Sequence, residues 1–131
     1  MNWLLFWGLI VIAIATDALG DSLRKSHKKI AHLVELLGLL LIAFLAFLTG
    51  FLHLAIGFTI LTYLLARIAL FSLFWNIFSK QPLTYLGNTD ITDILLNKFL
   101  VWTKFPRHFL LIFWALNLLA SFEIVRKLIF N

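Results

Sequence analysis

Six polar or ionisable side chains stand within or beside the long apolar segments of this sequence: Asp17, Asp21, His32, Glu35, Arg67 and Asn76. In a helix, two carboxylates four residues apart share one face, and so do a histidine and a glutamate three residues apart. The spacing therefore predicts that these groups converge near one membrane face. Such a cluster could hold a hard or borderline divalent metal ion, bind another ion, or pass protons.

Four of these side chains are candidate metal ligands: Asp17, Asp21, His32 and Glu35. A Mg²⁺ ion bound by one or two carboxylates would complete its shell with phosphate oxygens of a substrate. The chain has no H-E-x-x-H or D-x-D motif and no phosphate-cradling glycine loop, so no residue is assigned as catalytic. The competing interpretation makes the two aspartates helix-end residues that pair with Arg24 and Lys25. His32 would then lie at the membrane interface.

Arg67 is the most informative position, because it lies near the middle of a long apolar segment. An arginine at this depth costs about 2.5–3.5 kcal/mol on insertion scales. We expect an ion pair with Glu35 or with Asp17 to offset that cost, and we expect Asp21 to lie too far out. Two roles are compatible with the pattern. Arg67 could tie helices together with its head directed toward the cytoplasmic face, or it could bind a substrate, a lipid or an ion.

The composition is that of a membrane protein. Hydrophobic residues make up 63% of the chain and charged residues 13%, and the mean hydropathy is +1.01. Soluble domains are about 45–50% apolar and about 25% charged. A soluble domain of this size could not bury so much apolar surface. The chain has no cysteine, and its basic residues flank apolar runs without forming a separate basic face, which excludes nucleic acid as a partner.

Four segments are long and apolar enough to cross a bilayer, which takes about 20 residues of helix. They cover residues 3–19, 30–51, 54–78 and 109–124. Met1 and Asn2 supply no positive side chain, so we interpret the first segment as a membrane helix and not as a secretory signal. The short link from Gly50 to His53 predicts that the second and third helices form a tight antiparallel hairpin. The fold class is therefore all-α, a polytopic transmembrane helix bundle in a single domain over residues 1–131.

A shorter amphipathic segment lies between the third and fourth spans, over residues 90–104. Thr89 or Asp90 is a candidate N-cap, and the apolar residues recur at helical spacing: Ile91, Ile94, Leu95, Phe99 and Trp102. Asp93, Asn97 and Lys104 fall on the other side. The pattern predicts an amphipathic helix lying on the membrane surface.

The distribution of Lys and Arg predicts the orientation. Eight basic residues occupy the first and third connections: Arg24, Lys25, Lys28, Lys29, Lys80, Lys98, Lys104 and Arg107. Arg126 and Lys127 are the two on the opposite side. The positive-inside rule places both long connections in the cytoplasm and both termini outside. We expect a bacterial inner (plasma) membrane as the location.

Three classes of function are compatible with these features. The first is a non-enzymatic subunit or binding component of a membrane assembly, with a polar cluster at the cytoplasmic face. The second is a small membrane enzyme that acts on a lipid or isoprenoid phosphate, with a divalent metal as its cofactor. The third is conduction of an ion or small solute by an oligomer. The partners expected are membrane lipid and either other membrane protein subunits or further copies of this chain as a homo-oligomer.

Overall fold

A computed structural model of the chain describes residues 2–51, 53, 56–86 and 91–130, and within these residues it contains helices and no strand. The prediction of an all-α fold is confirmed. The elements are α1 (Trp3–Leu23), α2 (Lys28–Phe51), α3 (Ile56–Phe78), α4 (Ile91–Thr103), α5 (Phe109–Ile124) and a π-helical end to α5 (Val125–Ile129).

Four of these helices, α1, α2, α3 and α5 with its π-helical end, are long and apolar enough to cross a membrane, as the sequence predicts. Two boundaries differ from those predicted. Helix α1 continues to Leu23, and α2 begins at Lys28, so a connection of four residues joins them. The amides of Ser26 and His27 bond to the carbonyl of Leu23. This close turn allows both helices to extend to the connection. The predicted start of the third span at Leu54 lies outside the described residues.

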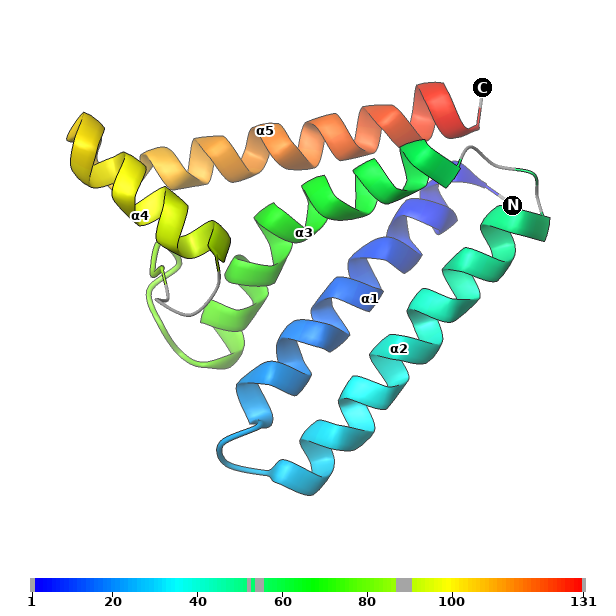
Figure 1. Cartoon of the computed structure of the whole chain (residues 1–131), viewed down its shortest axis with the longest axis horizontal. Coiled ribbons are helices and arrows are strands. Elements are labelled where there is room, and N and C mark those ends of the chain that lie inside the picture. Colours follow the sequence, from blue (N-terminus) through cyan, green and yellow to red (C-terminus); the bar gives the residue numbers. More distant parts are fainter. Residues whose placement is uncertain (1, 52, 54–55, 87–90, 131) are drawn as a thin grey trace.

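Helix α1 occupies the middle of the bundle. It lies between α2 and α3, and α5 packs on the far side of α3 (Figure 1). The predicted hairpin of the second and third helices is therefore wrong. Although the two helices are consecutive and antiparallel, α1 separates them over most of their length. The short link between the two helices gave no indication of which helices would be neighbours in space.

The two ends of the bundle differ in charge. Figure 1 shows both termini at one end, together with the end of α2 and the start of α3. The connection 24–27, the start of α2, residues 79–86, helix α4 and residues 104–108 lie at the other end, which we call the basic end because these segments carry eight Lys and Arg residues. Two basic residues, Arg126 and Lys127, lie near the termini.

The main core joins α1 to α3, to α2 and to the π-helical end of α5. Its buried members are Phe6, Ile10, Ala13, Ile14, Leu45, Ala66, Leu70, Val125 and Ile129. Small residues bring helix axes close together in membrane bundles. At Gly20, an added Cβ would lie 2.9 Å from Cγ of Glu35, so α1 and α2 approach each other there more closely than any other residue would allow.

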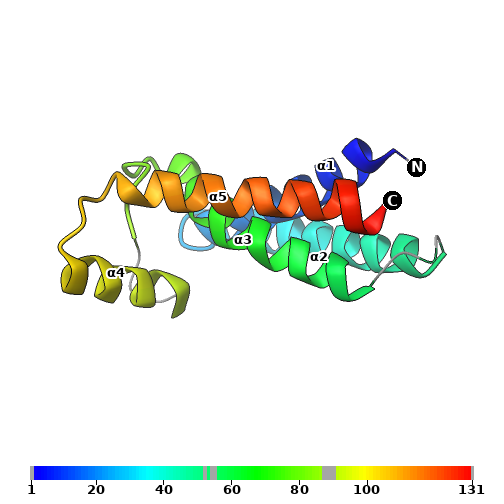
Figure 2. The same cartoon turned by 90° about the horizontal axis from the view of Figure 1, so that it is seen from above.

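A second core fixes α4 to the bundle. It contains Ala69, Leu86, Leu100, Leu110 and Trp114, which come from α3, the connection after it, α4 and α5. Helix α4 runs across the direction of the bundle helices at the basic end, and the turned view shows it beside α5 and not in line with it (Figures 1 and 2). Leu100 is the buried residue of α4, whereas Ile91, Leu95, Phe99 and Trp102 are exposed. The N-cap predicted at Thr89 or Asp90 lies outside the described residues.

Candidate functional site

Arg67 of α3 pairs with Asp17 of α1. Its Nη2 donates a hydrogen bond to Oδ2 of Asp17 over 3.3 Å. The two side chains are 36% and 38% exposed, so the pair lies at the edge of the helix contact. The sequence left Glu35 and Asp17 as alternative partners. Asp17 is the partner because its helix, α1, is the one that packs against α3, whereas Glu35 lies on α2 beyond it.

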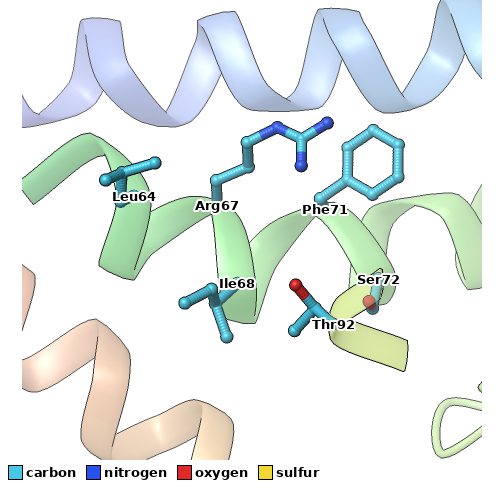
Figure 3. Close-up of a pocket in the computed structure, with 6 residues that line it drawn as sticks. All are labelled: Leu64, Arg67, Ile68, Phe71, Ser72 and Thr92. Atoms are coloured by element: carbon cyan, nitrogen blue, oxygen red, sulfur yellow. The ribbon is translucent and has the colours of Figure 1, made fainter. Parts of the chain in front are cut away.

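The guanidinium of Arg67 also lies over the ring of Phe71, with Cζ 4.4 Å from the ring centroid. Phe71 is one helical turn nearer the basic end. Figure 3 shows both side chains on the same side of α3, facing the neighbouring helix. The contact is a cation–π interaction, and it directs the charged head of Arg67 toward the basic end while its stem stays against the helix.

A second charged group lies nearer the basic end, around Glu35. Nη2 and Nε of Arg24 donate to Oε1 of Glu35 over 2.7 and 3.2 Å. Nδ1 of His32 lies 3.5 Å from the other carboxylate oxygen, and Nη1 of Arg24 lies 3.9 Å from Oδ1 of Asp21. The hydrogen bond to Glu35 raises the pKa of the Arg24 guanidinium above its ordinary value. Arg24 therefore fastens the first connection to α2 as a permanent cation.

The structure divides the predicted cluster into two groups. Asp17 belongs to Arg67, whereas Asp21, His32 and Glu35 surround Arg24. In the part of the chain that is described, no three His, Asp or Glu side chains gather closely enough to hold a metal ion. The four candidate ligands do not form a common site, because each arginine draws a carboxylate to itself. The Arg24–Glu35 pair had no counterpart in the sequence interpretation, which gave Arg24 to the aspartates.

Asn76 does not join the charged side chains. It is 1% exposed, and its Nδ2 donates to the carbonyls of Leu83 and Tyr85 over 2.9 and 3.0 Å. Its own carbonyl accepts from the amide of Gln81. Asn76 therefore holds the connection that follows α3 in its folded course. Because these partners are backbone groups of an irregular loop, no sequence pattern could have named them.

Ser72 and Asp93 join α4 to α3. Oγ of Ser72 donates to Oδ1 of Asp93 over 3.1 Å. Ser72 precedes the last residue of α3, Phe78, by six residues, which is about 9 Å along a helix axis. The start of α4 is therefore held beside α3 well before that helix ends. Sequence reasoning placed Asp93 on the polar side of its helix and missed this contact.

A cavity of about 220 Å³ lies between α3 and the first turn of α4, and we call it the Arg67 cavity. It is lined by Leu64, Arg67, Ile68, Phe71, Ser72 and Thr92, drawn in Figure 3. One guanidinium and two hydroxyl groups share its wall with apolar side chains. Ser72 and Thr92 were not candidates from sequence, because they reach the site only through the docking of α4.

Comparisons with known proteins add no family to this description. A scan against protein-family models, a search of curated proteins and a search of solved structures each found no match. The function is therefore argued from the helices, ion pairs and cavities of the chain itself.

Proposed function

We propose that the chain is a small non-enzymatic membrane protein, a subunit or binding component, whose charged side chains fasten its helices together at the cytoplasmic face. The observation that carries this proposal is the pairing of both charged groups. Asp17 bonds to Arg67, and Glu35 bonds to Arg24. A catalytic carboxylate must face its substrate, whereas these carboxylates face arginines of their own chain. Their geometry is that of ties between α1, α3, the first connection and α2.

The orientation proposed for the chain puts the basic end in the cytoplasm and both termini outside, in a bacterial inner membrane. The support is the eight-to-two division of Lys and Arg between the two ends of the bundle. Cytoplasmic connections carry an excess of these residues. The Arg67 side chain, which leans toward the basic end, would then reach toward the cytoplasmic headgroups.

Helix α4 is proposed to lie in the cytoplasmic membrane interface. Its buried residue Leu100 faces the bundle, while Ile91 and Trp102 are 74% and 82% exposed. Exposed apolar surface costs about 25 cal/mol per Å² in water, and lipid removes that cost. The bond between Ser72 and Asp93 supports this position, because it holds the start of α4 beside α3 about 9 Å before that helix ends.

The subunit proposal makes α2 a natural contact surface. Its outward face is apolar along its length, with Leu33, Leu40 and Phe47 exposed at seven-residue spacing. Photo-crosslinking side chains placed singly at these positions in native membranes should yield a discrete protein adduct, either with another subunit or with a second copy of this chain. The matched control is Ile10, which is buried and should give adducts only within the chain. Lipid adducts alone at all three positions, with a monomer by native mass spectrometry, would refute the subunit role.

A second candidate is an enzyme acting on a lipid or isoprenoid phosphate. The Arg67 cavity favours it, since a guanidinium and two hydroxyl groups line a space with apolar walls. Purified protein supplied with Mg²⁺ and a lipid phosphate would release inorganic phosphate or transfer the group if this candidate were correct. Under the subunit or binding proposal the lipid phosphate is recovered unchanged.

A further inference from the structure

A second space adjoins the Arg67 cavity beneath α4. It measures about 560 Å³, and we call it the α4 groove. Its lining comes from α3, α4 and α5: Ile68, Thr92, Leu95, Leu96, Phe99, Leu100, Phe109, Leu110 and Phe113. Ile68 and Thr92 line both spaces. The cavity and the groove therefore meet at the contact between α3 and the first turn of α4.

The two spaces differ in chemistry. The α4 groove is apolar apart from Thr92 and includes three phenylalanine rings. The Arg67 cavity carries a guanidinium, and among the described residues that line either space Arg67 is the one with a formal charge. A cation beside an apolar groove is complementary to a molecule with an anionic head and a hydrocarbon tail. In a membrane, that molecule is a lipid.

We infer that the space beneath α4 binds one anionic lipid of the cytoplasmic leaflet, with its phosphate at Arg67 and an acyl chain in the α4 groove. This inference rests on the proposed role as a binding component and names its ligand. Thr92 contributes a hydroxyl group to the lining of the cavity, whereas the hydroxyl group of Ser72 donates to Asp93. The Arg67 head leans toward Phe71, one helical turn nearer the basic end.

Asp17 leaves Arg67 able to bind a second anion. The Arg67–Asp17 distance of 3.3 Å exceeds the roughly 2.7–2.9 Å of a short charge-assisted hydrogen bond. A guanidinium has five N–H donors in a planar fork, and Asp17 accepts from Nη2 over that distance. A phosphate can therefore bind the fork without displacing Asp17. Asp17 and Phe71 hold the guanidinium in this position.

The acidic neighbours select the kind of phosphate. Asp17 bonds to Arg67, and Asp93 bonds to Ser72, so two carboxylates lie beside the proposed headgroup position. A phosphomonoester carries about −1.5 to −2 charges at pH 7, more than a phosphodiester with one. Repulsion by the carboxylates rises with that charge. We therefore expect the site to prefer a phosphodiester lipid such as phosphatidylglycerol over the monoester phosphatidic acid.

The test is native mass spectrometry of the delipidated full chain in detergent, titrated with phosphatidylglycerol, diacylglycerol and phosphatidic acid of identical acyl chains. Diacylglycerol has no phosphate to accept hydrogen bonds from Arg67, so phosphatidylglycerol should bind about tenfold or more tightly than diacylglycerol. Phosphatidic acid should bind more weakly than phosphatidylglycerol. Equal binding of the first two lipids would overturn the inference, and preference for phosphatidic acid would overturn the headgroup selection.

Substitutions at the proposed site and at a matched control site test where the lipid binds. The double variant Arg67→Leu/Asp17→Leu removes the charge without leaving a carboxylate unpaired, and it should lose the preference for phosphatidylglycerol. The matched control Arg24→Leu/Glu35→Leu removes the other ion pair at the same end of the bundle and should keep the preference. Thr92→Val, which leaves the Arg67–Asp17 pair intact, should weaken phosphatidylglycerol selectively. Loss of the preference in the control but not in the Arg67 variants would place the lipid elsewhere.

The groove has its own test, which also separates this inference from the proposed function. Leu96→Trp fills the α4 groove, so it should weaken all three lipids together and leave the headgroup preference unchanged. Unchanged affinity would remove the acyl-chain position. The lipid titrations measure binding at equilibrium and do not depend on a protein partner. If they fail while the crosslink to a protein partner succeeds, only the lipid site is rejected. Turnover of a lipid phosphate would instead reject the proposed non-enzymatic function.

Discussion

Arg67 and Asp17, fifty residues apart in sequence, join α3 to α1 through a hydrogen-bonded ion pair of 3.3 Å. The cost of placing either charge in an apolar segment is offset by the other. The pair also sets the register of the two helices, because Arg67 must meet a carboxylate at one level of α1. Its removal therefore changes both stability and geometry.

The first prediction concerns the stability of this pair. Arg67→Leu should lower the free energy of unfolding by about 1–3 kcal/mol, between the values known for exposed and buried pairs, because Asp17 is left without its partner. Arg67→Leu/Asp17→Leu should recover much of that loss. Reversible unfolding in mixed micelles measures both. A double variant that loses the full sum of the two single effects would show that the groups do not interact.

The second prediction concerns which groups are coupled. A double-mutant cycle of Arg67→Gln with Asp17→Asn should give a non-zero coupling energy, whereas Arg67→Gln with Glu35→Gln should give about zero, since changes with no shared partner add within about 0.3–0.5 kcal/mol. Glu35→Gln should couple instead to Arg24→Gln. Coupling of Arg67 to Glu35 would mean that α2, and not α1, supplies the partner.

The third prediction concerns Gly20, where α1 and α2 are in close contact. Gly20→Ala places a Cβ 2.9 Å from Cγ of Glu35 and should disturb the bond from Arg24. Gly8→Ala is the control, because nothing lies within 4 Å of its added Cβ. Both changes gain about 1 kcal/mol of helix propensity, but overpacking costs about 1–3 kcal/mol. Gly20→Ala should therefore be the less stable variant by thermal unfolding, and equal stabilities would argue against the close contact.

The fourth prediction concerns orientation. Single cysteines at Ser26 and Gln81, in the two connections of the basic end, should resist a membrane-impermeant maleimide in intact cells. A cysteine at His53, which is exposed in the link between α2 and α3, should react. The reason is the excess of Lys and Arg at the basic end, which keeps that end in the cytoplasm. The reverse labelling pattern would invert the proposed topology.

The fifth prediction concerns α4. Spin labels at Ile91, Leu95 and Trp102 should be accessible to oxygen dissolved in the bilayer, because these apolar residues are exposed and the proposed position of α4 puts them against lipid. A label at Leu100, on the opposite face of the helix, should be immobile. Accessibility should therefore vary with a period of about 3.6 residues. Water accessibility at all of these positions would place α4 away from the membrane.

The apolar spans could be predicted from sequence because their signal is local: about 20 apolar residues suffice to define a membrane helix. The helix over α4 was predicted for the same reason, from its own periodicity. The order of the helices in space is different, since it depends on which faces pack. The interpretation of the link from Gly50 to His53 as a hairpin failed on that point, because α1 inserts between the two helices.

The candidate site likewise combines features that are local in sequence with features that depend on how the helices pack. That Arg67 needs a carboxylate follows from the energy of a charge in lipid, and the sequence narrowed the choice to Glu35 or Asp17. The choice between them needed the position of α1. The partners of Asn76 and Asp93 could not be predicted from sequence, because they are a loop backbone and a serine on another helix. Such partners come together only after α4 and the loop before it have docked.

The central place of α1 has a consequence for biosynthesis. Asp17 is made before its partner Arg67, and the end of α5 that packs against α1 is made later still. At about 5–20 residues per second, the fifty residues that separate Asp17 from Arg67 take about 3–10 s to synthesise. During that interval Asp17 has no arginine from α3. Helix α1 therefore lacks its ion-pair partner until α3 has been made.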